Sequence, residues 1–189
     1  TDCLHVSGSI KFDGVATDRS NRATDRMREL FGLTPSETIF MAGSTQEPEE
    51  QLTIQAWLAC RKQFPALRLI LVPRHRERFD AVAQLVRSAG IELMRRSQLP
   101  SSIQPTSDAV ILVDSIGELS ACWGLADIAF VGGSFGNRGG QNMIEPAAFG
   151  AAVLFGPNTW NFRDVVRTFK EANACLQLNS PEELTPTLL

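Results

Sequence analysis

The chain has 189 residues, of which 43% are hydrophobic and 21% are charged. These proportions are those of an ordinary globular protein and exclude a disordered, collagen-like or coiled-coil chain. A net charge of −3 provides no basic field for nucleic acid, although Arg74, Arg76 and Arg78 can form a local basic cluster. A chain of this length buries roughly 70% of its unfolded surface and needs no disulfide or metal to fold.

The four cysteines are far apart and form no CxxC or Cys/His pattern, so neither a metal site nor a disulfide framework is expected. We expect Cys3, Cys60, Cys122 and Cys175 to be small core residues of a reducing compartment. No signal peptide is expected, and no apolar run approaches the roughly 18 residues of a membrane span. Because the sequence does not begin with Met, we expect it to be a soluble piece of a longer protein. It does not tell us whether that longer protein is attached to a membrane.

Two parts are expected along the chain. Residues 1–33 are expected to form a lead-in arm, with an extended segment at 4–12 and then a helix. The apolar face of this helix is predicted to hold Ala23, Met27, Leu30 and Phe31. Residues 34–189 are expected to form one Rossmann-like domain.

From Thr38 onward, short apolar runs alternate with helical patterns at intervals of about 20 to 30 residues, which is typical of parallel βαβ units. The predicted strands are 39–43, 67–72, 91–94, 109–113, 127–131, 151–155 and 174–178. Pro73 is expected to end the second strand, because proline cannot continue a central ladder. The fold class predicted is α/β, with a doubly wound, mostly parallel sheet covered by helices on both faces.

Three of the helices show an apolar face. The predicted faces are Leu52, Ala56, Ala59, Cys60 and Phe64 in the first, Phe79, Val82, Ala83 and Val86 in the second, and Val165, Val166 and Phe169 in the third. The polar stretch 95–107 has two prolines and no period, and it is expected to be irregular.

Small and polar residues follow four of the strands, as GST at 43–45, PRH at 73–75, DSIGE at 114–118 and GGSF at 132–135. Ligands of doubly wound sheets bind beyond the carboxyl ends of the strands, so this coincidence predicts a ligand site. Arg74 can make a forked contact to a phosphate or carboxylate. Each motif also has a structural alternative: GST can simply cap a helix, PRH can be a solvated basic turn, and His75 can be a structural hydrogen-bond donor.

The stretch from Ala126 to Phe162 is the most informative part of the sequence. Gly132, Gly133, Gly139 and Gly140 leave room for close approach of a ligand to the backbone. The predicted helix at 142–149 has free N–H groups at its start, which attract an anion. Glu145, inside this helix, is a good acceptor for the two hydroxyls of a ribose. The alternative is a glycine-rich surface loop.

Two common nucleotide sites do not fit. The sequence has no GxxxxGK[ST], which excludes a P-loop ATPase, and it has no GxGxxG followed by an acidic residue about 20 positions later, so a NAD site is poorly supported.

Six stretches, in order, resemble the 3-deoxy-D-manno-octulosonic acid (Kdo) transferases of lipopolysaccharide synthesis. They are GSIKFD (8–13), GSTQEPEE (43–50), LVPRHRERF (71–79), DSIGEL (114–119), ADIAFVGGSFGNRGGQNMIEPAAFG (126–150) and GPNTWNF (156–162). The resemblance covers about residues 6–178. It implies the C-terminal, donor-binding half of an inverting, metal-independent GT-B glycosyltransferase, without the N-terminal acceptor domain.

The resemblance also implies the ligands and their residues. CMP-Kdo is the implied donor substrate, and no cofactor is implied. The implied nucleotide-binding residues are Pro73, Arg74, Ile116, Gly117, Glu118, Asn142 and Glu145, with Glu145 on the ribose. The implied donor sugar and phosphate residues are Gly43, Ser44, Thr45, His75, Gly133, Ser134, Phe135, Gly139, Gly140 and Gln141.

The same resemblance places the general base, the lipid A precursor site and the membrane anchor in an N-terminal half, so no catalytic residue is expected in this chain. It places the parent protein at the cytoplasmic face of the bacterial inner membrane. Three positions depart from the family pattern: Gln46 and Gln141 each stand where His is usual, and Arg76 stands where Pro is usual. Two other functions remain open for the chain. It can be half of an epimerase or hydrolase that uses UDP-sugars, or a non-catalytic ligand-binding or scaffold domain.

Overall fold

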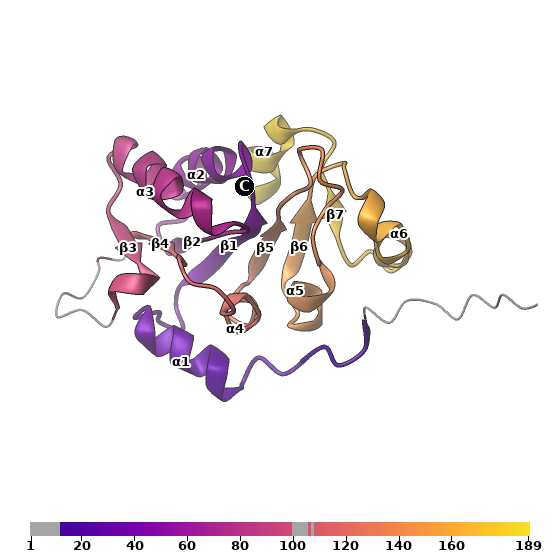
Figure 1. Ribbon diagram of the computed structural model, residues 1–189, viewed down its shortest axis with the longest axis horizontal. Coiled ribbons are helices and arrows are strands. Elements are labelled where there is room, and N and C mark those ends of the chain that lie inside the picture. The colour runs from indigo at the N-terminus through magenta and orange to yellow at the C-terminus, as the bar shows by residue number, and fades with distance from the viewer. Residues whose placement is uncertain (1–11, 100–105, 107) are drawn as a thin grey trace, which may run out of the picture.

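The computed structural model describes residues 12–99, 106 and 108–189. Its centre is a seven-stranded sheet in the order β3-β4-β2-β1-β5-β6-β7, and all six strand pairings are parallel (Figure 1). The strands are β1 (Thr38–Thr45), β2 (Leu67–Pro73), β3 (Leu93–Arg95), β4 (Val110–Leu112), β5 (Ile128–Val131), β6 (Ala152–Phe155) and β7 (Leu176–Gln177). The predicted strands and the doubly wound α/β class are confirmed. The extended segment expected at 4–12 lies outside the described residues, apart from Phe12.

Helices cover both faces of the sheet (Figure 1). One face carries α1 (Arg22–Leu30), α4 (Leu119–Trp123), α5 (Ile144–Ala148) and α6 (Arg163–Glu171). The other carries α2 (Glu49–Cys60), α3 (Phe79–Ser88) and α7 (Leu184–Leu188). Short 3-10 turns lie at Arg76–Arg78, Arg96–Gln98, Trp160–Phe162 and Pro181–Glu183.

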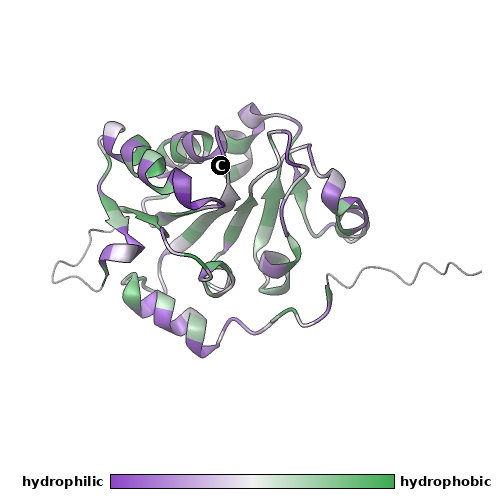
Figure 2. Cartoon of the chain, in the orientation of Figure 1, coloured by the Kyte–Doolittle hydropathy of each residue, from purple (hydrophilic) through white to green (hydrophobic). Residues whose placement is uncertain are grey.

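The strands divide the apolar residues between two cores. In β1, Ile39 and Met41 face the core under α1 and α4, whereas Phe40 and Ala42 face the core under α2 and α3. Both sets are buried because side chains alternate along a strand and both faces of a parallel sheet are covered. The strands are accordingly the most continuously hydrophobic part of the molecule (Figure 2).

Some of the predicted helix faces need correction. The faces of α3 and α6 are as predicted. The face of α2 is confirmed in part: Ala56 and Cys60 are buried, but Ala59 and Phe64 are exposed, while Thr53 and Trp57 are buried. Trp57 fixes this side, because its indole N–H donates to the carbonyl of Leu67 at 2.9 Å. In α1, Met27 is buried as predicted, but Ala23 is exposed and Thr24 is buried beside it. The Thr24 hydroxyl donates to the carbonyl of Ala121.

Pro73 ends β2, as predicted, although the strand includes it. Pro73 is the last residue of β2 and pairs with Thr45 across an irregularity in β1. A strand can include proline at its end, where the ladder no longer needs its N–H.

An arginine ties the segment before α1 to the sheet. Arg19 donates to the carbonyls of Gly124 and Ala126 and to the carboxylate of Asp127. Asp127 in turn accepts from the backbone N–H of Ile39 in β1. The predicted boundary at residue 33, between a lead-in arm and the Rossmann-like domain, stays a prediction.

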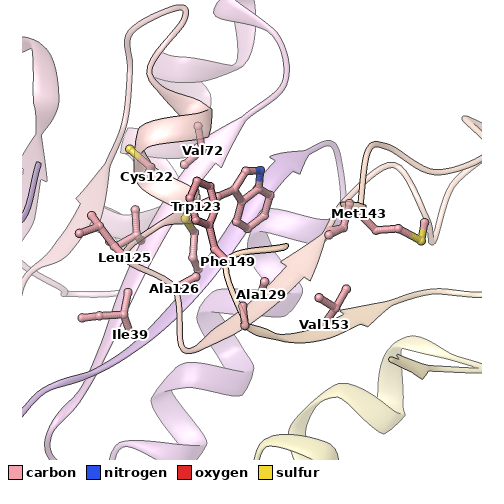
Figure 3. Packing of buried hydrophobic residues seen from close by; sticks show 14 of the residues in the cluster. Ile39, Val72, Cys122, Trp123, Leu125, Ala126, Ala129, Met143, Phe149 and Val153 are labelled. Atoms are coloured by element: carbon pink, nitrogen blue, oxygen red, sulfur yellow. The ribbon is translucent and has the colours of Figure 1, made fainter. Parts of the chain in front are cut away.

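Gly43 lies near the end of β1 against the buried ring of Trp123, which sits among the core residues in Figure 3. A Cβ at Gly43 would lie 2.5 Å from two carbons of that ring.

We predict that Gly43→Ala lowers the free energy of unfolding by about 1–3 kcal/mol, the usual cost of overpacking. Urea denaturation measures the change. Gly136→Ala is the control, since nothing lies within 4 Å of a Cβ there. Equal stability of the two variants would contradict the close packing at Gly43.

Candidate functional site

The sheet order brings the four polar motifs together. Strands β4, β2, β1 and β5 are neighbours in this order, so the loops that follow them lie along one edge of the sheet. The chain leaves β1 toward β2 on one side and leaves β5 toward β6 on the other. The point between β1 and β5, where the direction of winding reverses, is where doubly wound folds bind ligands.

Glu49, in the first turn of α2, connects the loops after β1 and β5. Its side chain is buried, and its two carboxylate oxygens accept from four backbone N–H groups. The donors are Gln46 at 3.0 Å, Gly133 at 2.7 Å, Ser134 at 2.8 Å and Phe135 at 3.0 Å. We call these groups the Glu49 cluster. Burial raises the pKa of Glu49, and the four N–H groups act in the opposite direction.

The Glu49 cluster changes the interpretation of the glycine loop, which we define as residues 132–141. The sequence suggested that a ligand approaches the backbone of this loop, but the N–H groups of Gly133, Ser134 and Phe135 already donate to an internal carboxylate. The Ser134 hydroxyl is also engaged, since it donates to the Val131 carbonyl and accepts from the Gly156 N–H, both at 2.8 Å. These groups shape the loop from inside.

Glycine is required at two successive positions of this loop for different reasons. At Gly132, a Cβ would lie 2.6 Å from the Cα of Thr45 and 2.7 Å from a carboxylate oxygen of Glu49. Gly133 has φ +67°, which side chains rarely adopt. The loop closes where the N–H of Gly140 donates to the carbonyl of Gly133 at 2.8 Å. Its neighbour Gly139 accepts from the N–H of Asn161 at 3.0 Å.

The GST motif is largely buried. Gly43 packs on Trp123, and Ser44 has a positive φ of 55°. Thr45 is fully buried, and in the part of the chain that the structure describes its hydroxyl has no hydrogen-bond partner. The structure therefore places Gly43 in the core and Ser44 and Thr45 directly beneath the edge of the sheet.

The PRH motif lies beside the GST motif. The Arg74 backbone N–H donates to the carbonyl of Thr45 at 3.0 Å, while the Arg74 side chain is exposed. His75 is half-buried and lines a cleft.

The loop after β4 is held by ion pairs to the end of β3 and to the segment that follows it. Asp114, whose side chain is only 1% exposed, accepts from Arg95 Nε at 2.6 Å and from the Ser97 N–H at 2.7 Å. Glu118 accepts from Arg96 at 2.7 Å. The loop thus presents the exposed side chain of Ile116 and the backbone at Gly117, while the Glu118 carboxylate faces Arg96.

Asn142 and Glu145 form a pair at the start of α5. The Asn142 amide donates to the Glu145 carboxylate at 2.9 Å, and its carbonyl oxygen accepts from the N–H of Ile144 at 3.1 Å. The predicted helix at 142–149 is shorter in the structure, with five residues, and Glu145 is in its first turn. The pair is half-buried and close to the glycine loop in sequence.

Two hollows lie along this edge. A cleft of about 300 Å³ is lined by Gln46, Glu47, Glu49, His75, Glu77, Arg78, Gly133, Gly136, Asn137 and Arg138. A larger hollow of about 900 Å³ lies between α1 and the loop after β4, where Gly117 and Glu118 line it with Arg22 and Arg26. The predicted residues are therefore divided between two places: His75 and Gly133 line the first, and Gly117 and Glu118 line the second.

Sequence reasoning did not assign the charged residues of the cleft to a ligand site. Arg78, expected in a basic cluster, pairs with Glu47 at 2.8 Å and with the buried Glu50 at 3.1 Å, and Arg138 lies in the glycine loop. Glu49 falls within the GSTQEPEE motif, but no role was predicted for it. Its signal was weak, since two consecutive acids at a helix start are ordinary helix chemistry.

Two glutamines meet beside Gly133. A Cβ on Gly133 would lie 3.1 Å from Gln141 Cγ, 3.3 Å from Gln141 Nε2 and 3.5 Å from Gln46 Nε2. Both side chains are half-buried. Two of the three positions that depart from the family pattern are thus neighbours in space.

Among residues 12–99, 106 and 108–189, no group of three His, Cys, Asp or Glu side chains is placed to hold a metal. The described helices include none that is long and apolar enough to cross a membrane. Cys60 and Cys122 are buried and free, and Cys175 is half-buried and free.

Solved structures define the class of this fold. The C-terminal CMP-Kdo binding domain of WaaA from Acinetobacter baumannii matches with a TM-score of 0.78, at 29% identity over 88% of this chain and 86% of that chain. The C-terminal domain of a glycosyl transferase group 1 family protein from Francisella tularensis matches with a TM-score of 0.54 at 16% identity, over 92% of this chain and 82% of that chain, which shows the fold alone. The chain has the architecture of the C-terminal domain of a GT-B glycosyltransferase.

Curated relatives narrow the class to a family. The 3-deoxy-D-manno-octulosonic acid transferases of Haemophilus influenzae and Bordetella pertussis are each 38% identical to the chain, over 94% and 91% of its length. No protein-family model matches. The chain belongs with the 3-deoxy-D-manno-octulosonic acid transferases, which confirms the resemblance, and it spans about 40% of the length of these relatives.

We predict that Asp114→Asn loosens the loop after β4 and lowers the free energy of unfolding at pH 7 by about 1–3 kcal/mol. Burial alone would raise the pKa of Asp114, but hydrogen bonds from Ser97 and Arg95 outweigh it and lower the pKa. The stabilisation is therefore present above the unfolded pKa of about 4 and is lost as the pH falls through the lower folded value.

The measurement is urea denaturation of both proteins from pH 7 to pH 3, where the difference between them is expected to shrink. Asp164→Asn is the control, because Asp164 lies in an exposed ion pair on α6. A difference that stays constant with pH would show that the Asp114 charge is unimportant.

Proposed function

We propose that this chain binds CMP-Kdo as the donor-binding half of a glycosyltransferase that transfers Kdo to a lipid A precursor. The observation that carries the proposal is the match to the CMP-Kdo binding domain from A. baumannii, which covers most of both chains. The sequence identity to two Kdo transferases supports the same donor. We further propose an inverting, metal-independent reaction, with the general base and the acceptor site in another part of a longer parent at the inner membrane.

The nucleotide is proposed to lie along the edge formed by the loops after β2 and β4 and by α5. The proposed contacts are Pro73, Arg74, Ile116, Gly117, Glu118, Asn142 and Glu145. The loop after β4 would offer mainly backbone groups to the cytosine, because the Glu118 side chain is paired with Arg96. Glu145 would accept the ribose hydroxyls, with Asn142 holding its carboxylate in place. Arg74 is exposed and is proposed to pair with the phosphate.

The phosphate and sugar acid are proposed to lie over the glycine loop toward the smaller cleft. Since the N–H groups of Gly133, Ser134 and Phe135 are occupied by Glu49, the polar contacts there would come from side chains. His75 and Arg138 line the cleft, and Gln46 and Gln141 meet at Gly133. Glutamine amides donate hydrogen bonds to carboxylate and hydroxyl oxygens without carrying charge.

A nucleotide panel tests the donor class. We expect CMP to raise the melting temperature of the chain in a thermal-shift assay, and UDP, GDP and ADP to raise it less at equal concentration. A preference for UDP would favour an epimerase or hydrolase half, and no shift with any nucleotide would favour a scaffold domain.

Replacing Glu145 tests the ribose contact. Glu145→Ala is expected to weaken CMP binding by about 2 kcal/mol, or roughly thirtyfold, because hydrogen bonds to a charged acceptor are lost. Isothermal calorimetry measures the change, with Glu171→Ala on the exposed part of α6 as the control. Unchanged affinity in a folded Glu145→Ala protein would rule out the ribose role.

The chain alone is expected to give no Kdo transfer. Transfer requires the acceptor hydroxyl, its base and the donor carbon within a few ångströms of one another, and the chain spans only about 40% of its relatives. The measurement is an assay with CMP-Kdo and a lipid A precursor, and a transferred Kdo would contradict the division of roles.

A further inference from the structure

We propose that Glu49 is a positioning residue for the part of the donor beyond the nucleotide, acting through the glycine loop. This inference rests on the proposed function. Three N–H groups of the loop converge on the buried carboxylate of Glu49, and the loop then presents its outer side to the sugar.

The hydrogen bonds of Glu49 join segments that are distant in sequence. Three of its four donors lie in the loop after β5, more than 80 positions along the chain, and only Gln46 is local. These two loops flank the point where the winding of the sheet reverses. A carboxylate has about four lone-pair positions, so one glutamate satisfies four donors that would otherwise be buried without partners.

The neighbouring contacts leave the loop little freedom on its inner side. Gly132 allows the backbone of Thr45 and the Glu49 carboxylate to come close. The hydroxyl of Ser134 donates to the carbonyl of Val131 and accepts from the N–H of Gly156. Three charge-assisted hydrogen bonds to Glu49 thus fix the position of Gly133 and of the two residues that follow it.

The outer side of the same backbone is where the glutamines lie. Gln46 donates to Glu49 through its backbone N–H, while its side chain approaches Gly133 and lines the cleft. Gln141 approaches Gly133 from the far end of the loop. A shift of Gly133 would therefore move the surface between the two amides, whereas Asn142 and Glu145 keep their own hydrogen bond in α5.

The test separates sugar binding from nucleotide binding. Calorimetric Kd values for CMP and for CMP-Kdo are measured with wild type, Glu49→Gln, Glu49→Asp and Glu37→Gln. Glu37 is the matched control, because it pairs with the buried Arg68 at the start of β2, away from the carboxyl ends of the strands.

We expect Glu49→Gln to weaken CMP-Kdo binding at least tenfold while CMP binding stays within twofold. Glu49→Asp should lie between wild type and Glu49→Gln, because it keeps a charged acceptor but reaches less far. Glutamine has the size of glutamate but places N–H donors against backbone N–H groups. A purely packing role would give the opposite order, with Gln the better substitute, and that order overturns the proposal.

Equal losses for CMP and CMP-Kdo would also overturn it, since they would indicate general damage. If Glu49→Gln does not fold, Gln46→Ala carries the test, because it removes the outward side chain and keeps the backbone N–H; unchanged CMP-Kdo binding in that variant is then the contradicting result. If the wild type binds neither nucleotide, the proposed function fails and this inference fails with it. If the wild type binds both equally and the variants match it, only the role of Glu49 fails.

Discussion

The carboxylate of Glu49 is the contact on which the ligand edge of this fold depends. Two loops that follow neighbouring parallel strands each bring backbone N–H groups to the same buried carboxylate. Without an acceptor there, each N–H would remain unpaired at a cost of about 1–3 kcal/mol. One carboxylate within the chain accepts from all four, so the shape of the two loops is set by internal contacts. A preformed site loses less conformational entropy when it binds.

Around this contact, the site is built from short elements fixed by side chains. The loop after β4 is anchored by Asp114 and Glu118 to the arginines at the end of β3 and directly after it, and α5 begins with the Asn142 to Glu145 hydrogen bond. The sheet contributes the order β4-β2-β1-β5, which puts the four loops side by side. The sheet thus brings the four loops close together, and the polar pairs orient the residues of each loop.

The sequence predicted the fold well because strands buried on both faces read as apolar runs, and the seven runs all correspond to strands. The faces of α3 and α6 were also evident, whereas the face of α2 was only partly predicted, because Trp57 and two buried acids also belong to it. The predicted site residues do gather at one edge. What the sequence did not reveal is which groups are already paired. Glu49 meets Gly133 only after β1 and β5 lie side by side, and no local pattern reports a contact across 84 positions.

The two outermost strands are short, which affects the tendency of the chain to aggregate with copies of itself. β3 has three residues and β7 has two, so each border of the sheet shows only a few backbone groups that a second sheet could pair with. Long, flat borders are the usual starting point for strand-to-strand aggregation, and short ones suppress it. The sheet therefore ends on both sides in a form that resists continuation into a neighbouring molecule.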